Sequence, residues 1–201
     1  MFQRHAFGGM RFGFLCVLAS GIFMPMSLAQ APVFAIDKSN SSVTFSSASI
    51  SIAGKFDKWD ATLTFTSPDV TTGVLDIKAQ ASSVDTGSGV KDDTLRGGDF
   101  FNADHDPYIT FHSSKIVQTG ANTFSIPGTF TIRGVSRPET LNLTVSGEGT
   151  GSGEIKGVMA FDRKDYGMNS GIPFIHIADR VEVDVDLHGK RVSGPPLKLK
   201  R

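Results

Sequence analysis

The feature of this sequence that most constrains its fold is the alternation of apolar and polar residues that recurs from Val33 onward. In the clearest case, Val181–Leu187, every second residue is apolar and every intervening residue is acidic. A period of two is typical of a β-strand that buries one face and exposes the other. Strands of a parallel sheet would instead read as continuous apolar runs joined by helical crossovers. The pattern therefore predicts an all-β protein with half-buried antiparallel strands.

Turn residues separate the alternating segments, as in the glycine-rich stretch Gly147–Gly153. Their spacing predicts about eight strands joined by hairpins. Because the sequence contains no amphipathic helix long enough to cover a sheet, closure of the sheet on itself is the simplest way to remove its edges. We therefore expect an antiparallel β-barrel of about eight strands with one or two short helices, and a closed β-sandwich is the alternative. Such a barrel holds either packed side chains or one slender ligand.

Residues 1–29 have the features of a cleaved signal peptide. Arg4 and Arg11 precede a short apolar run, and Ser27–Ala29 supplies small residues at the cleavage positions. The apolar run is shorter than the ~20 residues that a membrane-spanning helix needs. We expect export, with no stable membrane span after cleavage; an uncleaved N-terminal anchor is the alternative.

The remaining chain has the composition of one ordinary globular domain. Its only cysteine, Cys16, lies in the signal, so the exported protein forms no disulfide. The full chain has 20 basic and 20 acidic residues, and loss of the two signal arginines leaves an excess of two acids. This balance argues against a nucleic-acid-binding protein. We expect a single domain over residues 30–193 and a flexible tail over residues 194–201.

One segment, Leu95–Phe111, interrupts the strand pattern. Asp92 or Asp93 can cap a short helix at its start, with Leu95 on the apolar face. The pair Gly97–Gly98 inside this helix would cost about 1 kcal/mol per glycine relative to alanine. The helix must therefore be short, and we expect the docking of Phe100–Phe101 to hold it in place.

Three sequence blocks resemble a known family: Leu95–Phe111, Gly128–Leu141 and Phe161–Met168. Their order and spacing are similar to those of the YceI-like family of bacterial periplasmic lipid- or polyisoprenoid-binding proteins, over essentially all of the exported chain. The resemblance implies an extended lipocalin-like barrel whose apolar interior holds a long-chain amphiphile. It also implies a protein that binds, transports or stores its ligand without catalysis.

The ligand implied is a polyisoprenoid, an isoprenoid quinone or a fatty-chain lipid, with no cofactor, and a homodimer is one option for the assembly. Of the 16 phenylalanines, 11 lie outside the signal, against two tyrosines and one tryptophan, and they suit a lining for a tail that makes no hydrogen bonds. The residues expected to line the cavity are Phe45, Leu63, Phe65, Leu75, Ile77, Phe100, Phe111, Phe130, Ile132, Leu143, Phe161, Met168 and Val183.

Several cations within the three blocks are candidates for contact with a polar or anionic head group, because arginine binds phosphate through two parallel hydrogen bonds. These candidates are Arg96, Arg133, Arg163 and Lys164. The simpler interpretation of each is surface charge balanced by nearby acids.

Two alternatives to lipid binding remain at this stage. His105 and its acidic neighbours Asp104 and Asp106 could serve a metal-assisted hydrolase. Adjacent residues rarely point at one ion, so a solvated turn is the simpler interpretation, and catalytic motifs such as HExxH are absent from the sequence. The second alternative is an exported β-protein with a filled core that serves protein partners. We expect a binding protein rather than an enzyme.

Overall fold

The computed structural model describes residues 30–47, 52–147, 151–171 and 177–199. The predicted signal, residues 1–29, lies outside this part of the chain. The described elements, with η for 3₁₀-helices, are β1 (Val33–Ile36), η1 (Lys38–Asn40), β2 (Ser42–Ser47), β3 (Ile52–Phe56), β4 (Trp59–Thr64), η2 (Val70–Thr72), β5 (Val74–Gln80), η3 (Ala81–Ser83), β6 (Val84–Asp85), α1 (Gly89–Arg96), β7 (Tyr108–Ser113), β8 (Val117–Gln118), β9 (Thr123–Ile132), β10 (Val135–Ser146), β11 (Ser152–Asp162), η4 (Arg163–Tyr166) and β12 (Arg180–Ser193).

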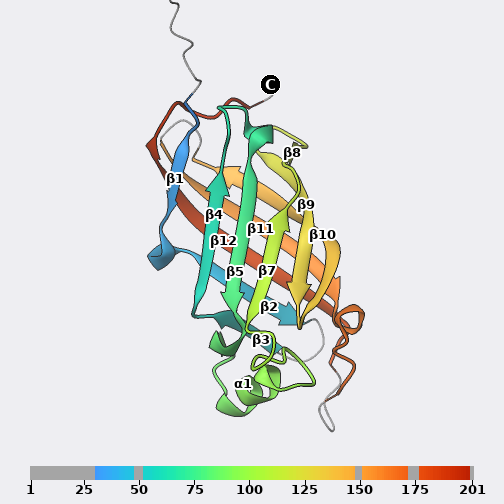
Figure 1. Cartoon of the computed structure of the whole chain (residues 1–201). Helices are drawn as coiled ribbons and strands as arrows, with labels where there is room; N and C mark the ends of the chain where they lie inside the picture. Colours follow the sequence, from blue (N-terminus) through green and yellow to red (C-terminus); the bar gives the residue numbers. More distant parts are fainter. Residues whose placement is uncertain (1–29, 48–51, 148–150, 172–176, 200–201) are drawn as a thin grey trace, which may run out of the picture.

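The strands form one antiparallel sheet in the order β4-β5-β7-β9-β10-β11-β12-β2-β3-β6, with β1 on β12 and β8 on β9. Figure 1 shows this sheet curling into a lipocalin-like half-barrel, with α1 at the end opposite the C-terminus. The prediction of an all-β antiparallel barrel with a short helix is confirmed. The described residues contain twelve strands rather than about eight, because β6 and β8 are two-residue pieces and β1 and β2 lie end to end along β12.

The seam of the barrel lies between β1 and β4, which run side by side. In the part of the chain that the structure describes, the two strands share no backbone ladder. Side chains bridge the seam instead. The rings of Phe34 and Phe65 pack with their centroids 5.7 Å apart, and Lys38 forms an ion pair with Asp60. Packing rather than hydrogen bonding therefore closes the sheet here.

The end of the barrel near the C-terminus is filled with side chains. A Cβ atom added at Gly73 would lie 2.5 Å from Ile116 and 2.7 Å from Phe65, so only glycine fits between them. Leu75 is 1% exposed, and its backbone N–H donates to the buried hydroxyl of Ser113 over 2.8 Å. The side chains of the described residues at this end thus pack closely on one another.

The helix differs from the prediction in its position. α1 begins at Gly89, and its N-cap residue Ser88 makes no side-chain cap. Asp92 lies within the first turn and accepts from the backbone N–H and the hydroxyl of Thr86, over 2.8 and 2.7 Å. The helix ends at Arg96, so Gly97–Gly98 follow it rather than lie inside it. The expected cap was wrong because the Asp92 carboxylate turns back to Thr86.

Part of the C-terminal tail packs against the barrel. The backbone N–H of Lys198 donates to Pro68 over 2.7 Å, and its carbonyl accepts from Val70. Leu197 and Leu199 pack on the core beside it. Composition gave no sign of this packing, and the flexibility expected for residues 194–201 stays a prediction. No α-helix of the described chain is long and apolar enough to cross a membrane.

The filled end should dominate the stability of the fold. We expect Leu75→Ala to lower the free energy of unfolding by about 2–5 kcal/mol, because it opens a cavity in a tightly packed core. Val158, which is 45% exposed on the outer face, is the control, and Val158→Ala should change stability by less than about 0.5 kcal/mol. Urea titration measures both, and equal losses would contradict the proposed distribution of packing.

Candidate functional site

An apolar cavity of about 90 Å³ lies inside the barrel toward the α1 end. Residues from the strands, from α1 and from the segment after it surround the cavity. Its few polar neighbours are Ser47, Thr110 and Arg163. A space with this lining excludes charged or strongly hydrated molecules and suits a hydrocarbon chain.

Nine of the thirteen residues expected to line a cavity do surround this one: Phe45, Ile77, Phe100, Phe111, Phe130, Ile132, Phe161, Met168 and Val183. The other four, Leu63, Phe65, Leu75 and Leu143, do not line it and pack into the core instead. The alternation indicates which face of a strand points inward, but it does not indicate at what height along the barrel a residue lies. Contact of these residues with a ligand stays a prediction.

The expected lining left out several cavity residues, among them Leu95, Phe56 and Met159. Phe101, which was expected to dock together with Phe100, lines the cavity as well. Phe56 and Met159 lie on alternating strands, so their inward direction could have been predicted from the pattern. Phe101 follows the buried Phe100 directly, and both point inward because the segment after α1 is a tight loop rather than a strand. Within this loop the Phe101 backbone N–H donates to Leu95 over 2.9 Å.

Two groups of aromatic rings shape this end of the interior. Phe101 packs against Phe45 and Phe56, with centroids 6.1 and 5.9 Å away. Phe130 and Phe161 lie 5.0 Å apart in the second group and pack on Tyr166. Both groups have the tilted or edge-on arrangement that aromatic rings prefer.

Tyr166 fixes the second ring group to the barrel. Its side chain is fully buried, and its hydroxyl donates to Glu139 over 2.9 Å. Burial, together with the hydrogen bond to the Glu139 carboxylate, raises the pKa of Tyr166 above its ordinary value. The phenol therefore stays a neutral hydrogen-bond donor and holds its ring against Phe130 and Phe161.

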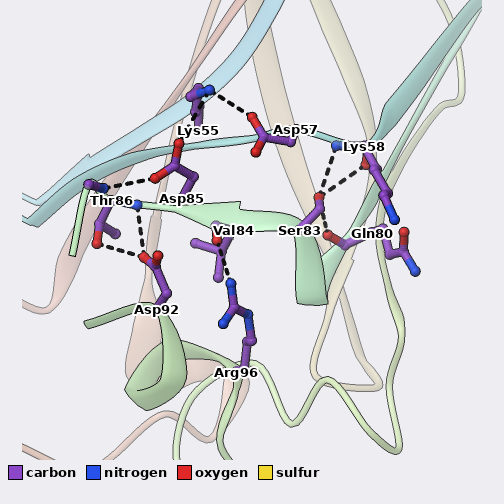
Figure 2. Close-up of polar contacts among 11 residues, drawn as sticks. Lys55, Asp57, Lys58, Gln80, Ser83, Val84, Asp85, Thr86, Asp92 and Arg96 are labelled. Carbon is purple, nitrogen blue, oxygen red and sulfur yellow. Dashed lines mark hydrogen bonds and ion pairs between the residues drawn. The ribbon is translucent and has the colours of Figure 1, made fainter. Parts of the chain in front are cut away.

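Polar contacts fasten α1 to the free edge of β6 (Figure 2). The Arg96 guanidinium donates to the carbonyls of Ser82 and Val84 over 2.9 and 3.0 Å. Among the described strands, β6 pairs with β3 alone, and these bonds lie on its other side. On the opposite edge, Asp85 accepts from Lys55 and from the backbone N–H of Gly87. The Gly87 bond, supported by Lys55, holds the pKa of the Asp85 carboxyl below its ordinary value. Arg96 therefore caps an exposed strand edge.

The buried candidate for head-group contact, Arg163, is occupied by the protein itself. Its guanidinium donates to the carbonyls of Met168, Ser170 and Ala178, the last two over 2.9 and 3.3 Å. It also pairs with Asp179 over 3.2 Å. Three carbonyls and one carboxylate around a side chain that is 7% exposed make Arg163 the anchor of the segment before β12.

The other three candidates also have partners within the chain. Lys164 pairs with Asp179 over 2.7 Å, and Arg96 binds the β6 edge. The Arg133 Nε and Nη2 atoms both donate to the Gly98 carbonyl, over 3.2 and 2.8 Å. A head group would have to replace these partners, and contact of any of the four cations with a ligand stays a prediction.

The residues considered for metal binding do not gather into one site. His105 is exposed in a turn, where its backbone N–H donates to Asn102 over 3.0 Å. Among the described residues, one group of three potential ligands lies on the β11–β12 ladder, and His105 is not in it: Glu154, Asp186 and His188. The Lys156 ammonium lies 2.8 Å from Glu154 and already neutralises part of this group.

Comparison with known proteins agrees with the geometry. The YceI-like domain family matches residues 34–189. A UPF0312 protein of Shewanella sp. (strain MR-7) is 26% identical over an alignment of 187 residues that covers 88% of this chain and 97% of that protein. A UPF0312 protein of Pseudomonas aeruginosa (strain LESB58) is 31% identical over 96 residues, 48% of this chain and 50% of that protein.

Solved structures share the barrel. The crystal structure of Burkholderia cenocepacia BcnA superposes with a TM-score of 0.69 at 27% identity, covering 77% of this chain and 99% of that one. A polyisoprenoid-binding domain from Saccharophagus degradans superposes with a TM-score of 0.63 over 80% of this chain and 99% of that one, and at 17% identity it shows the fold alone. Since the family match spans most of the described chain, the protein belongs to the YceI-like family.

Proposed function

We propose that this protein binds a long-chain amphiphile, a polyisoprenoid, an isoprenoid quinone or a fatty-chain lipid, and carries or stores it in the periplasm without catalysis. The observation that carries the proposal is the apolar cavity, which is lined almost entirely by aliphatic and aromatic side chains. Membership in the YceI-like family and the shared barrel of a polyisoprenoid-binding domain support the same ligand class. The predicted signal, residues 1–29, supports export to the periplasm.

Burial of the tail alone can supply the affinity. Each buried methylene contributes about 0.8 kcal/mol, so one five-carbon isoprene unit contributes roughly 4 kcal/mol. Micromolar binding needs about 8 kcal/mol net, after an association and ordering cost of about 4–15 kcal/mol. About three to six buried isoprene units therefore suffice, without a charged contact to the head group.

Uptake of such a tail requires the interior to expand. The cavity of about 90 Å³ is smaller than the roughly 300–1,000 Å³ typical of ligand pockets. The rings at the α1 end are the side chains best placed to move, because Phe100 and Phe101 lie on a loop rather than on a strand. We infer that a ligand displaces these rings as it enters.

Direct identification of a bound lipid tests the function. We expect organic extraction of the purified protein, followed by mass spectrometry, to release a long-chain amphiphile, and delipidated protein to take up an added polyprenol. The control is protein unfolded in urea and washed before extraction. Absence of any extracted lipid together with no uptake of polyprenol would contradict the proposal.

A substitution that fills the cavity tests its location. Val183 lines the cavity, and Val158 lies on the outer face of the adjacent strand β11, opposite Asp184. We expect Val183→Phe to weaken polyprenol binding by about tenfold or more, because the added ring occupies the space needed by the tail. Val158→Phe should leave binding unchanged. Fluorescence competition measures both, and equal affinities for the two variants would place the tail elsewhere.

A further inference from the structure

The three sequence blocks that resemble the family meet at one side chain, Arg133. Its guanidinium donates twice to the carbonyl of Gly98, which belongs to the first block. On the other side it covers Gly167 of the third block, where an added Cβ would lie 2.7 Å from Nη1. Arg133 itself lies in the second block. The guanidinium thus occupies a slot between two glycines, and it joins the β9–β10 turn to the loop after α1.

The backbone at Arg133 is built to project this side chain. Arg133 and Gly134 are the two central residues of the β9–β10 hairpin, and their φ angles are 54° and 70°. Positive φ at both positions is the type I′ hairpin turn, in which asparagine followed by glycine is the preferred pair. Arginine is therefore conformationally unfavourable at this position. Its presence points to a role for the guanidinium beyond the turn.

The loop that Arg133 holds has different attachments at its two ends and in its middle. At its beginning, Arg96 and Asp92 tie α1 to the β6 edge and to Thr86. At its end, the Pro107 carbonyl accepts from the backbone N–H of Ala81 over 3.0 Å. The middle, which carries Phe100 and Phe101 into the cavity, is held to the opposite wall through the Gly98 carbonyl. Loss of the Gly98 hydrogen bonds therefore leaves the packing of Phe101 on Phe45 and Phe56 to hold this segment against the strands.

The geometry points to Arg133 as the positioning residue that controls access to the cavity. While Nε and Nη2 bind the Gly98 carbonyl, the loop is shut and the rings fill the entrance. An amphiphile with an oxygen acceptor in its head group can take over both donors, so the loop is released as the head group is bound. This inference rests on the proposed function. It places the entry route of the ligand between the 97–106 loop and the β9–β10 turn.

Arg133→Asn separates this role from the role of the turn. Asparagine tolerates positive φ and keeps the preferred hairpin pair, but it is too short to reach Gly98. Arg133→Lys keeps the charge without the two-donor fork. Arg137→Gln is the matched control, because Arg137 lies on the same hairpin and donates to the Asp165 carbonyl rather than to the loop.

We call the hydrogen bonds from Arg133 to the Gly98 carbonyl the latch. Hydrogen exchange in the ligand-free protein tests whether this latch holds the loop. The backbone N–H groups of Phe101 and Ala103 bind the carbonyls of Leu95 and Arg96 within the loop. We expect Arg133→Asn to accelerate exchange of these two amides by about tenfold, with the β11–β12 ladder unchanged, and Arg137→Gln to have no effect. Unchanged exchange in the Arg133→Asn protein would overturn the latch, whatever the protein binds.

Stopped-flow uptake of two fluorescent probes tests the coupling. The probes are an 18-carbon polyene fatty acid, which has a carboxylate, and diphenylhexatriene, which has no oxygen. We expect Arg133→Asn to speed uptake of both by about tenfold but to weaken equilibrium binding of the fatty acid alone, with Arg133→Lys intermediate. Equal affinity changes for both probes would contradict the proposal that the head group replaces the Gly98 carbonyl as the acceptor for Arg133. Failure of the wild-type protein to bind either probe would count against the proposed function, and the amide exchange would still decide the latch.

Discussion

The fold depends on the register of β12. This strand pairs along one edge with β11 and along the other with β2 and then β1, so it sets the position of three others. Its inward positions carry the valines and the leucine of Val181–Leu187, and its outward positions carry acids. A shift by one residue would turn Glu182, Asp184 and Asp186 into the apolar interior, where unpaired charges are very costly. The acidic residues of β12 thus fix its pairing register, and this register directs the apolar side chains of β12 toward the cavity.

The interior that results is packed unevenly along the barrel. At the end near the C-terminus, Gly73 leaves only enough room for Phe65 and Ile116 to meet. At the α1 end, the lining contains rings on a loop and on opposing strands, with space between them. The same alternating pattern built both ends. A period of two therefore does not determine how closely the side chains pack at each end.

The sequence pattern predicted the class of fold and the inward faces of the strands, because both follow from a period of two. It could not place residues along the barrel axis, so Leu63, Phe65, Leu75 and Leu143 were expected in the cavity but pack elsewhere. The predicted cap of α1 was wrong because the Asp92 carboxylate accepts from Thr86 rather than from the backbone at the start of the helix. The burial of Arg163 had no local signal, since its carbonyl partners come from a later segment of the chain.

The family resemblance identified the three sequence blocks but did not indicate the contacts between them. In the structure, Arg133 spans from Gly98 to Gly167, and Tyr166 reaches Glu139, so each block supplies partners for another. These contacts are polar or depend on a missing side chain, and neither kind leaves a periodic mark in a sequence.

The filled end of the barrel has a consequence for the orientation of any cargo. With Phe65, Ile116 and Leu75 packed into one end, the cavity lies toward the α1 end, and the proposed function requires a chain to enter there, tail first. Its polar end is then left at the surface, beside the same loop that admitted it.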